Sequence, residues 1–595
     1  MLTFSYLCIN QITFSPRGNA VALNDRKSEN LHLKLVVNSN ADQGIQPNAV
    51  LTLREAIALA NGTLSLNNLT QQEKAQVEQL NSNLPSRIEF NLPTTNTIIR
   101  LNAELPHLHS PGLIIDGTTQ PSYDPNRFAN PEINIPTPIV EITPSEQVEV
   151  FRGLTISADS VVIRGLSLYG FTAKHRDTVF TPAADIFVAN SLPQTETNFN
   201  QNQDVFPFDN TRDAPKNVLI ENNWLGVQAN GKKLAKTSAF GVSVFNSLGT
   251  NIRKNLIANH DGSAIITSVQ AENLQVSENV IIDNGFAGMP DAIRLEGKIN
   301  NSQINSNLIC GNDGSAVFLF KPEGAIKINN NNIQYNGNRL SRAAIYLMGN
   351  NHQVINNQIS NQTGAGVVIA AYPKSDRNII QNNHFAAITG LSIDLNTQQD
   401  LGVEQFQRGD GINPRRNSPN RRLDTANAAI NAPLFMAKEF YVIDGKVNID
   451  GIADPGSQIE VYKVTENTSN YGTLSEPIAM VNTDAKGKFS LTLSSLQPGD
   501  KISAIATDPK YGTSEPALNA IITSLNPQKI GINITESTSS LPERPQLFSQ
   551  CNKTFSSSQI KHIANRVSLL NHFEQVVYFS SNAAMQNLQP NRRGG

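Results

Sequence analysis

The sequence predicts an all-β fold, a right-handed parallel β-helix followed by a β-sandwich, from three observations. A phrase of the form Ile/Val-x-x-Asn-x-Ile/Leu/Phe occurs seven times between Ile220 and Phe385, with its asparagines 24 to 32 residues apart. Each copy is followed by a small residue and an apolar-x-apolar run, such as Ala292 to Leu295. Roughly seven short alternating runs, separated by turn signals, fill residues 437–524. A period near 25 residues indicates a solenoid, and alternation indicates strands rather than helices.

The repeated asparagine is expected at a sharp bend between two strands of each coil. Asparagine tolerates the left-handed conformation, and its amide can hydrogen-bond to the amide of the next coil. We therefore interpret the seven asparagines as a structural ladder and not as ligands. They are Asn223, Asn255, Asn279, Asn307, Asn331, Asn357 and Asn383.

Alternation in the apolar-x-apolar runs places one residue of each coil on the outer face of one sheet. This outward column reads Ser243, Ile266, Arg294, Phe318, Tyr346, Val368 and Ser392. The next outward column reads Phe245, Ser268, Glu296, Phe320, Met348, Ala370 and Asp394.

The asparagine pattern resembles the pectate-lyase-like superfamily of right-handed parallel β-helices. The resemblance implies that the ladder occupies one turn of every coil. It also implies that the apolar-x-apolar runs form the sheet whose outer face often carries the active site of these proteins. The two outward columns are therefore the first places to look for function.

The N-terminal part carries a second resemblance. Residues 51–57, Leu-Thr-Leu-Arg-Glu-Ala-Ile, followed by Ala60-Asn61, resemble the CSLREAI signature near the start of many bacterial secreted β-helix proteins, with Leu51 in place of cysteine and Thr52 in place of serine. A short amphipathic helix here would cover the open end of the solenoid. Residues 1–35 precede it as a separate segment. Its Ala20-Val21-Ala22 has the form of a signal-peptide cleavage site, but no basic residue precedes the apolar part, so a misassigned start is an equal alternative.

We expect the β-helix to span residues 36–433, with a long polar insertion at about 172–216. Insertions in solenoids gather on one face and often form a binding wall. Relatives often have a calcium-suited aspartate-rich loop after the last coil. Here residues 414–422 contain four arginines, which repel a divalent cation and argue against calcium. We expect no metal and no other cofactor.

Residues 434–524 are expected to form the β-sandwich. Segments 451–457, 487–491 and 504–508 resemble bacterial Ig-like modules of surface proteins. The last part, 525–595, reads as a linker, a short helix near 558–579 and a flexible tail.

Charge and hydropathy give no sign of a nucleic-acid partner or of a membrane-spanning segment. The 47 basic and 50 acidic residues give a net charge of −3, so nothing marks a nucleic-acid-binding protein. No stretch of 18 or more apolar residues predicts a transmembrane helix. The oligomeric state cannot be read from the sequence.

The outward columns bring Arg294, Glu296, Phe318 and Tyr346 together across three coils. Aromatic rings beside a charged pair suit a sugar, so Arg294, Phe318 and Tyr346 are the predicted ligand-binding residues. The alternative is that the insertion or the sandwich covers these rings, because a bare apolar patch of this size is unusual.

Catalysis has weaker support. Arg294, with Lys321 and Lys327 one coil further on, is the only candidate base cluster for a lyase, and Glu296 is the accompanying carboxylate. Glu296 and Asp394 lie four coils apart, about 19 Å, too far for the carboxylate pair of a glycoside hydrolase.

Taken together, the chain resembles bacterial secreted or cell-surface β-helix proteins. Our first hypothesis is a non-catalytic extracellular or cell-surface protein that binds a polysaccharide or cell-surface glycan, or acts in adhesion or structure. Our second is a polysaccharide lyase or glycoside hydrolase acting on an acidic glycan at Arg294 and Glu296. The fold alone does not decide whether the protein is an enzyme.

Overall fold

The computed structural model describes residues 31–525, apart from 129–134, 174–181, 191–212, 232–235, 398–406, 417, 420–423 and 466–469. The cleavage-site motif at 20–22 and the helix expected near 558–579 lie outside the described residues. So does most of the insertion at 172–216.

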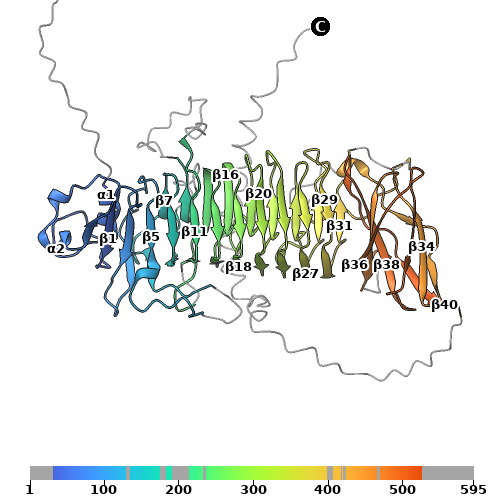
Figure 1. The fold of residues 1–595 in the computed structure, drawn as a ribbon, viewed down its shortest axis with the longest axis horizontal. Helices are drawn as coiled ribbons and strands as arrows, with labels where there is room; N and C mark the ends of the chain where they lie inside the picture. Colours follow the sequence, from blue (N-terminus) through green and yellow to red (C-terminus); the bar gives the residue numbers. More distant parts are fainter. Residues whose placement is uncertain are drawn as a thin grey trace, which may run out of the picture.

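Three long sheets, parallel except where β2 pairs antiparallel with β1, wind around one axis and form a β-helix (Figure 1). Sheet A runs β2 (Val77–Gln79), β1 (Leu33–Val37), β3 (Arg87–Phe90), β5 (Ile114–Asp116), β8 (Val162–Arg164), β11 (Leu219–Glu221), β14 (Asn251–Arg253), β17 (Gln275–Ser277), β20 (Ser302–Asn305), β23 (Ile326–Asn329), β26 (Gln353–Ile355) and β29 (Ile379–Gln381). Sheet B runs β4 (Ile98–Leu101), β6 (Val140–Pro144), β9 (Leu166–Leu168), β12 (Trp224–Leu225), β15 (Leu256–Ala258), β18 (Val280–Ile282), β21 (Leu308–Cys310), β24 (Asn332–Gln334), β27 (Gln358–Gln362) and β30 (His384–Ile388). Sheet C runs β7 (Arg152–Ile156), β10 (Ala184–Val188), β13 (Val242–Leu248), β16 (Ile265–Glu272), β19 (Ile293–Leu295), β22 (Val317–Leu319), β25 (Ile345–Leu347), β28 (Val367–Ile369) and β31 (Ile393–Leu395). The predicted all-β parallel β-helix is confirmed.

The first apolar residue of each repeat points into the solenoid and stacks on its counterpart in the next coil. These residues pair in register in sheet A, so the same side-chain position is filled at every level. Burial of this column removes a continuous apolar surface from water, which stabilises the stack. The fully buried residues are Ile220, Ile252, Val276, Ile304, Ile328, Val354 and Ile380.

The seven repeated asparagines form one hydrogen-bonded line at the bend between sheets A and B. In each coil the side-chain oxygen accepts the backbone N–H and the side-chain N–H of the asparagine before it, as Asn307 does from Asn279 at 3.0 Å in both bonds. The Nδ2 of Asn307 also donates to the carbonyl of Val276 at 2.9 Å. All seven are at most 1% exposed, so the ladder satisfies buried polar groups inside the turn.

A second ladder lies five residues further along each coil, after sheet B. Asn284 donates its backbone and side-chain N–H to Asn312, and Asn312 does the same to Asn336. His260 and Gln362 extend the line at its two ends. Each coil is therefore held to the next at two bends as well as along three sheets.

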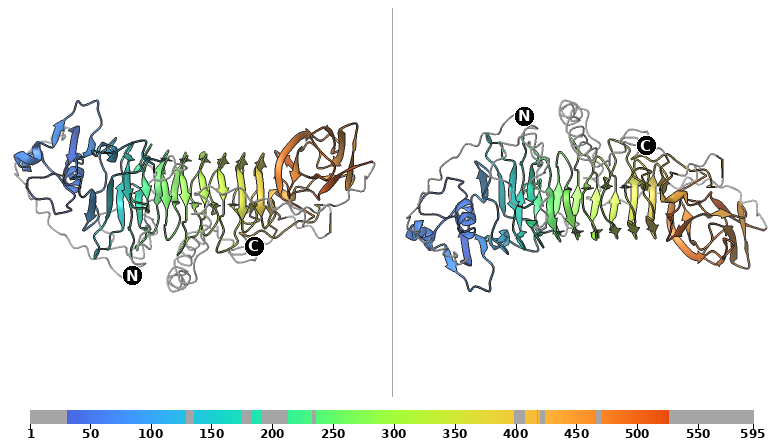
Figure 2. Two further views of the ribbon diagram at one scale, coloured as in Figure 1. Left: turned by 90° about the horizontal axis from the view of Figure 1, so that it is seen from below. Right: turned by 90° about the horizontal axis from the view of Figure 1, so that it is seen from above.

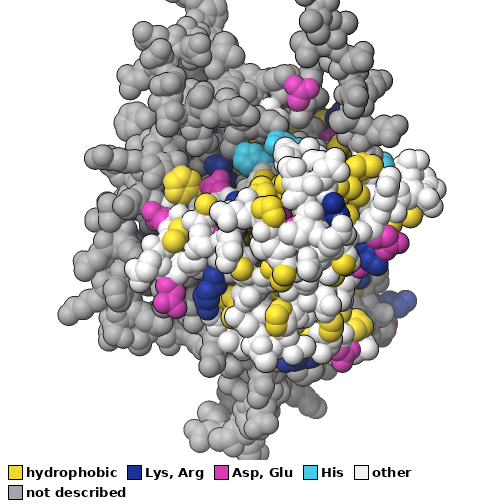
Figure 3. All heavy atoms as spheres, turned by 90° about the vertical axis from the view of Figure 1, so that its left-hand side faces the viewer, with side chains coloured by type: hydrophobic (Ala, Val, Ile, Leu, Met, Phe, Trp, Pro, Cys, Tyr) yellow, Lys and Arg dark blue, Asp and Glu magenta, His cyan; other side chains and the backbone are white. Residues whose placement is uncertain are grey.

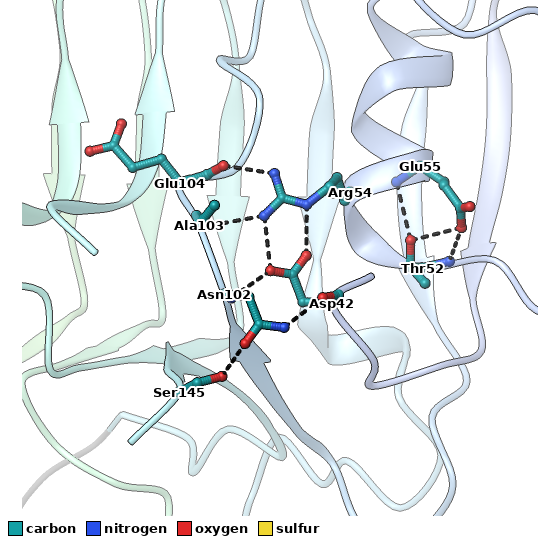
Figure 4. Close-up of polar contacts among 8 residues, drawn as sticks. All are labelled: Asp42, Thr52, Arg54, Glu55, Asn102, Ala103, Glu104 and Ser145. Atoms are coloured by element: carbon teal, nitrogen blue, oxygen red, sulfur yellow. Dashed lines mark hydrogen bonds and ion pairs between the residues drawn. The ribbon is translucent and has the colours of Figure 1, made fainter. Parts of the chain in front are cut away.

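A short helix covers the N-terminal end of the solenoid. Helix α1 (Leu53–Ala60) begins at Thr52, whose hydroxyl accepts the N–H of Glu55 while the Glu55 carboxylate accepts the N–H of Thr52. Arg54 pairs with Asp42 at 2.7 and 2.9 Å and donates to the carbonyls of Ala103 and Glu104 (Figure 4). The LREAI segment thus ties the helix to the strands that it caps.

The rest of this end is a polar loop region. Helix α2 (Gln71–Lys74) follows the turn η1 (Leu66–Asn68), and its capping box joins Thr70 and Glu73 as their spacing predicts. Viewed end-on, the surface shows scattered hydrophobic side chains among polar ones, not one apolar face (Figure 3). The open core is therefore closed at this end.

The C-terminal unit covers the other end. Its strands are β32 (Leu434–Phe435), β33 (Glu439–Ile443), β34 (Lys446–Ile452), β35 (Gln458–Val464), β36 (Leu474–Asn482), β37 (Lys488–Leu493), β38 (Lys501–Asp508), β39 (Gly512–Thr513) and β40 (Ala520–Ser524). They pair antiparallel except for β33 and β40, and curl around a core of their own (Figure 2). Whether this unit is Ig-like stays a prediction.

This unit docks directly on the last coil. Tyr462, Leu474 and Ile505 join the solenoid core, and the Glu460 carboxylate accepts the backbone N–H of Asn382 at 2.9 Å. Thr513 accepts the N–H of Ile380 at 2.8 Å. Backbone N–H groups at the open edge of the last coil thereby find hydrogen-bond acceptors in the C-terminal unit.

Candidate functional site

The outward column predicted for sheet C is present. Arg294 pairs in register with Phe318, Phe318 with Tyr346, and Tyr346 with Val368, on the successive strands β19, β22, β25 and β28. Three of the four residues predicted to meet, Arg294, Phe318 and Tyr346, therefore lie on one face, and Glu296 contacts Arg294.

Arg294 is held by its neighbours. Its Nη2 lies 3.5 Å from Oε2 of Glu296, and its guanidinium carbon lies 4.9 and 4.8 Å from the ring centres of Phe318 and Phe320. Stacking on two rings and pairing with a carboxylate fix the guanidinium in place. Arg294 is only 7% exposed, so little of it is open to a ligand.

Phe318 and Tyr346 are fully buried. Their ring centres are 5.5 Å apart, and they pack with Met348 and Val368 in a small apolar cluster on the outside of sheet C. Burial and the nearby charge of Asp410 raise the pKa of Tyr346. These two rings therefore offer no face to a sugar in this structure. Cover by the insertion or by the sandwich, the alternative given above, stays a prediction.

Part of the cover comes from the chain after the last coil. The carbonyl of Gln407 accepts the N–H of Ala343 at 2.7 Å, and Nε of Arg408 donates to the carbonyl of Leu340 at 3.1 Å. Gln407 and Arg408 therefore lie beside this face. The sequence does not show this, because nothing in residues 407–413 repeats or pairs by pattern.

Four residues at the border of the same face, which we name the sheet C rim, are Glu296, Phe320, Lys321 and Tyr372. Phe320 is buried, and Glu296 and Lys321 are half-buried. Tyr372 is 59% exposed. The Lys321 ammonium lies 5.9 Å from the ring centre of Tyr372 and 5.5 Å from that of Phe320. Burial raises the pKa of Glu296, while Arg294 opposes that rise. The rim thus presents the exposed Tyr372 ring beside a cation.

Two other charged residues considered for catalysis, Lys327 and Asp394, lie far from Arg294 and Glu296. Lys327 points outward on β23 of sheet A, not on sheet C with Arg294, so the predicted three-residue base cluster is wrong. Asp394 lies on β31, four strands from Glu296, or about 19 Å. It is 3% exposed, and its pKa is raised by burial and by Glu515 and Asp410.

One buried network contains a serine, an aspartate and a histidine, but their hydrogen bonds do not follow the order of a catalytic triad. Nε2 of His260 lies 2.9 Å from Oδ2 of Asp185, and Ser238 donates to Oδ1 of the same aspartate at 2.5 Å. The serine therefore faces the carboxylate and not the imidazole, and all three residues are 0% exposed. Without a serine–histidine contact or an opening, the network joins coils and activates no nucleophile.

The described residues contain neither a metal-type cluster nor a membrane-spanning helix. No group of three or more His, Cys, Asp or Glu in the described ranges could hold a metal ion. Within the same ranges no helix has the length and apolar character that a membrane crossing requires.

No family model and no curated protein matches this chain. Several solved structures resemble it at low identity, among them the following three. Geobacillus virus E2 ORF18 is 10% identical, with 74% of this chain and 69% of that chain covered and a TM-score of 0.36. DFA-IIIase from Arthrobacter chlorophenolicus A6 is 12% identical, with 62% and 74% covered and a TM-score of 0.27. The A-module of the Azotobacter vinelandii mannuronan C-5 epimerase AlgE4 is 12% identical, with 52% and 89% covered and a TM-score of 0.30.

Proposed function

We propose that this protein is a non-catalytic polysaccharide-binding protein of the extracellular space or cell surface, and that the sheet C rim contacts the glycan. The observation that carries the proposal is the exposed ring of Tyr372 beside the Lys321 ammonium. A sugar ring packs its C–H face on an aromatic ring, while its hydroxyls bond to the charged groups at the ring's edge.

The rim is better suited to binding than to catalysis. Arg294, the candidate base, is stacked between two rings and paired with Glu296, so its guanidinium already has partners. Glycoside hydrolysis needs a second carboxylate within about 5 to 9.5 Å. Asp291 is fully buried and paired with Arg342 at 3.1 Å, and Asp394 is about four strand spacings away.

The binding test compares two exposed tyrosines. Tyr372→Ala should weaken retention on immobilised polysaccharides at least tenfold, because it removes the stacking ring. Tyr441→Ala, a 42% exposed tyrosine on β33 of the C-terminal unit, should leave retention unchanged. Equal loss in both variants, or no retention of the native chain by any uronate or neutral polysaccharide, would refute the rim as the binding site.

A product assay tests the absence of catalysis. Incubation with the same polysaccharides should yield neither new reducing ends nor unsaturated products. Product that appears with the native chain and disappears with Arg294→Ala would establish the enzymatic alternative at Arg294 and Glu296 instead.

A further inference from the structure

A pocket of about 350 Å³ lies on the outer face of sheet B, near the N-terminal end of the solenoid and on a different sheet from the rim. Its walls come from the turn before β4, from residues 120–127 and 137–141 that lead into β6, and from residues 229–230 after β12. Three stretches far apart in the sequence therefore build one hollow. A volume of this order lies at the small end of ligand pockets.

The floor of the pocket contains a nearly buried carboxylate. Glu141 lies on β6 between Val140 and Ile142, which point into the solenoid core, so its side chain points outward. Its Oε2 accepts the N–H of Ala229 at 3.4 Å, and Tyr169 also hydrogen-bonds to it, which with burial raises the pKa of Tyr169. Glu141 is 9% exposed, and Arg127 lines the same pocket.

A carboxylate of this kind retains acceptor capacity. Its two oxygens offer about four lone-pair sites, and the contacts above use only part of them. Since few solvent molecules reach it, hydroxyl groups of a ligand are suitable donors.

A second polar group of the wall is unsatisfied. The Thr137 hydroxyl has no hydrogen-bond partner among the described residues, although Thr137 is only 5% exposed. A hydroxyl both donates and accepts, and a buried one without a partner costs free energy. Pro121, Pro138 and Ile139 supply apolar wall beside it. Glu141, Thr137 and these side chains together offer hydrogen bonds to hydroxyls and contact to C–H groups.

We propose that this pocket binds one hydroxyl-rich six-carbon sugar ring. A pocket of about 350 Å³ has room for such a ring, whose hydroxyls donate to Glu141 and exchange hydrogen bonds with Thr137 while its C–H face rests on the apolar wall. Arg127 also lines the pocket, and its guanidinium can donate to ring hydroxyls as well. The proposal does not depend on the rim, since the two sites occupy different sheets.

The test uses a matched pair of variants on the exposed turn at the pocket mouth. Thr94 lines the pocket and Thr95 does not, although both are exposed. Binding of glucose, galactose and mannose to the full chain is measured by saturation-transfer NMR and titration. At least one hexose should bind the native chain. Thr94→Trp should raise its dissociation constant at least tenfold by blocking the mouth, while Thr95→Trp should not change it.

Three further variants test the role of Glu141 and distinguish the pocket from the sheet C rim. Glu141→Gln should weaken the same binding at least tenfold, whereas Glu149→Gln, an exposed glutamate outside the pocket, should not. Tyr372→Ala should leave hexose binding intact. The proposal is overturned if no hexose binds the native chain, if Thr94→Trp and Thr95→Trp bind alike, or if Tyr372→Ala abolishes binding, which would place the sugar at the rim.

Discussion

Replacing Asn307 by alanine should lower the free energy of unfolding by about 3 to 5 kcal/mol. Its side chain makes five hydrogen bonds of 2.9 to 3.0 Å, accepting two from Asn279 and donating to Val276, Asn305 and Asn331. At about 1 kcal/mol for each buried bond, the loss reaches about 5 kcal/mol. It falls to about 3 kcal/mol if some groups keep other partners, as Nδ2 of Asn279 does with the carbonyl of Ile252.

The matched control is Asn305→Ala in the same coil. The Asn305 side chain points outward on β20, so its removal should change stability by no more than about 0.5 kcal/mol. Urea unfolding of the full chain, followed by circular dichroism, measures both variants. If Asn307→Ala and Asn305→Ala differ by less than about 1 kcal/mol, the ladder does not stabilise the stack and the interpretation of the repeat is wrong.

Three further results are expected. Arg54→Ala should lower the melting temperature, because it leaves the buried Asp42 carboxylate without its cation. Arg54→Lys should restore only part of the loss. An unchanged melting temperature in Arg54→Ala would contradict a stabilising role for the Arg54–Asp42 pair at the N-terminal end. Burial lowers the pKa of His352 to about 4, and its Nδ1 accepts the N–H of Ile326, so protonation opposes folding. The stability contributed by neutral His352 is complete above the unfolded pKa of about 6.5 and is lost as the pH falls toward 4, which amounts to about 2 kcal/mol between pH 7 and 5. In urea titrations, the free energy of unfolding of His352→Gln should therefore depend less on pH than that of the native chain. Identical pH dependence in the two proteins would contradict this. A chain ending at residue 433 should aggregate in light-scattering measurements, since β29, β30 and β31 lose their cover, whereas a monodisperse solution would show that the C-terminal unit is not needed there.

Much of the solenoid could be predicted because one coil constrains the next. Stacking requires the same apolar position to recur, so the spacing of Ile304 and Ile328 is enough to predict that they share a column. The second ladder follows the same rule, because Asn284, Asn312 and Asn336 each lie five residues after a repeat asparagine. The repeat was defined by only one asparagine per coil, so this second ladder was not predicted.

The sites were less predictable, because they depend on segments that do not repeat. Alternation correctly placed Phe318 and Tyr346 on the outer face of sheet C, but it carries no information on what lies above that face. Lys327 was grouped with Arg294 through sequence distance, although a turn separates their sheets. The pocket at Glu141 is built by loops with no internal period, so only coordinates bring its walls together.

The most direct test of the stacked coils is a distance between two exposed positions on sheet A. Arg87 and Lys327 are 240 residues apart in the sequence but only seven strand spacings apart along the sheet, or about 34 Å. Spin labels on a ketone-bearing amino acid at both positions, which leave the native cysteines unlabelled, allow double electron–electron resonance to measure it. The account predicts one narrow distribution near that distance. A broad distribution, or a mean beyond about 50 Å, would contradict a continuous parallel stack with this strand spacing.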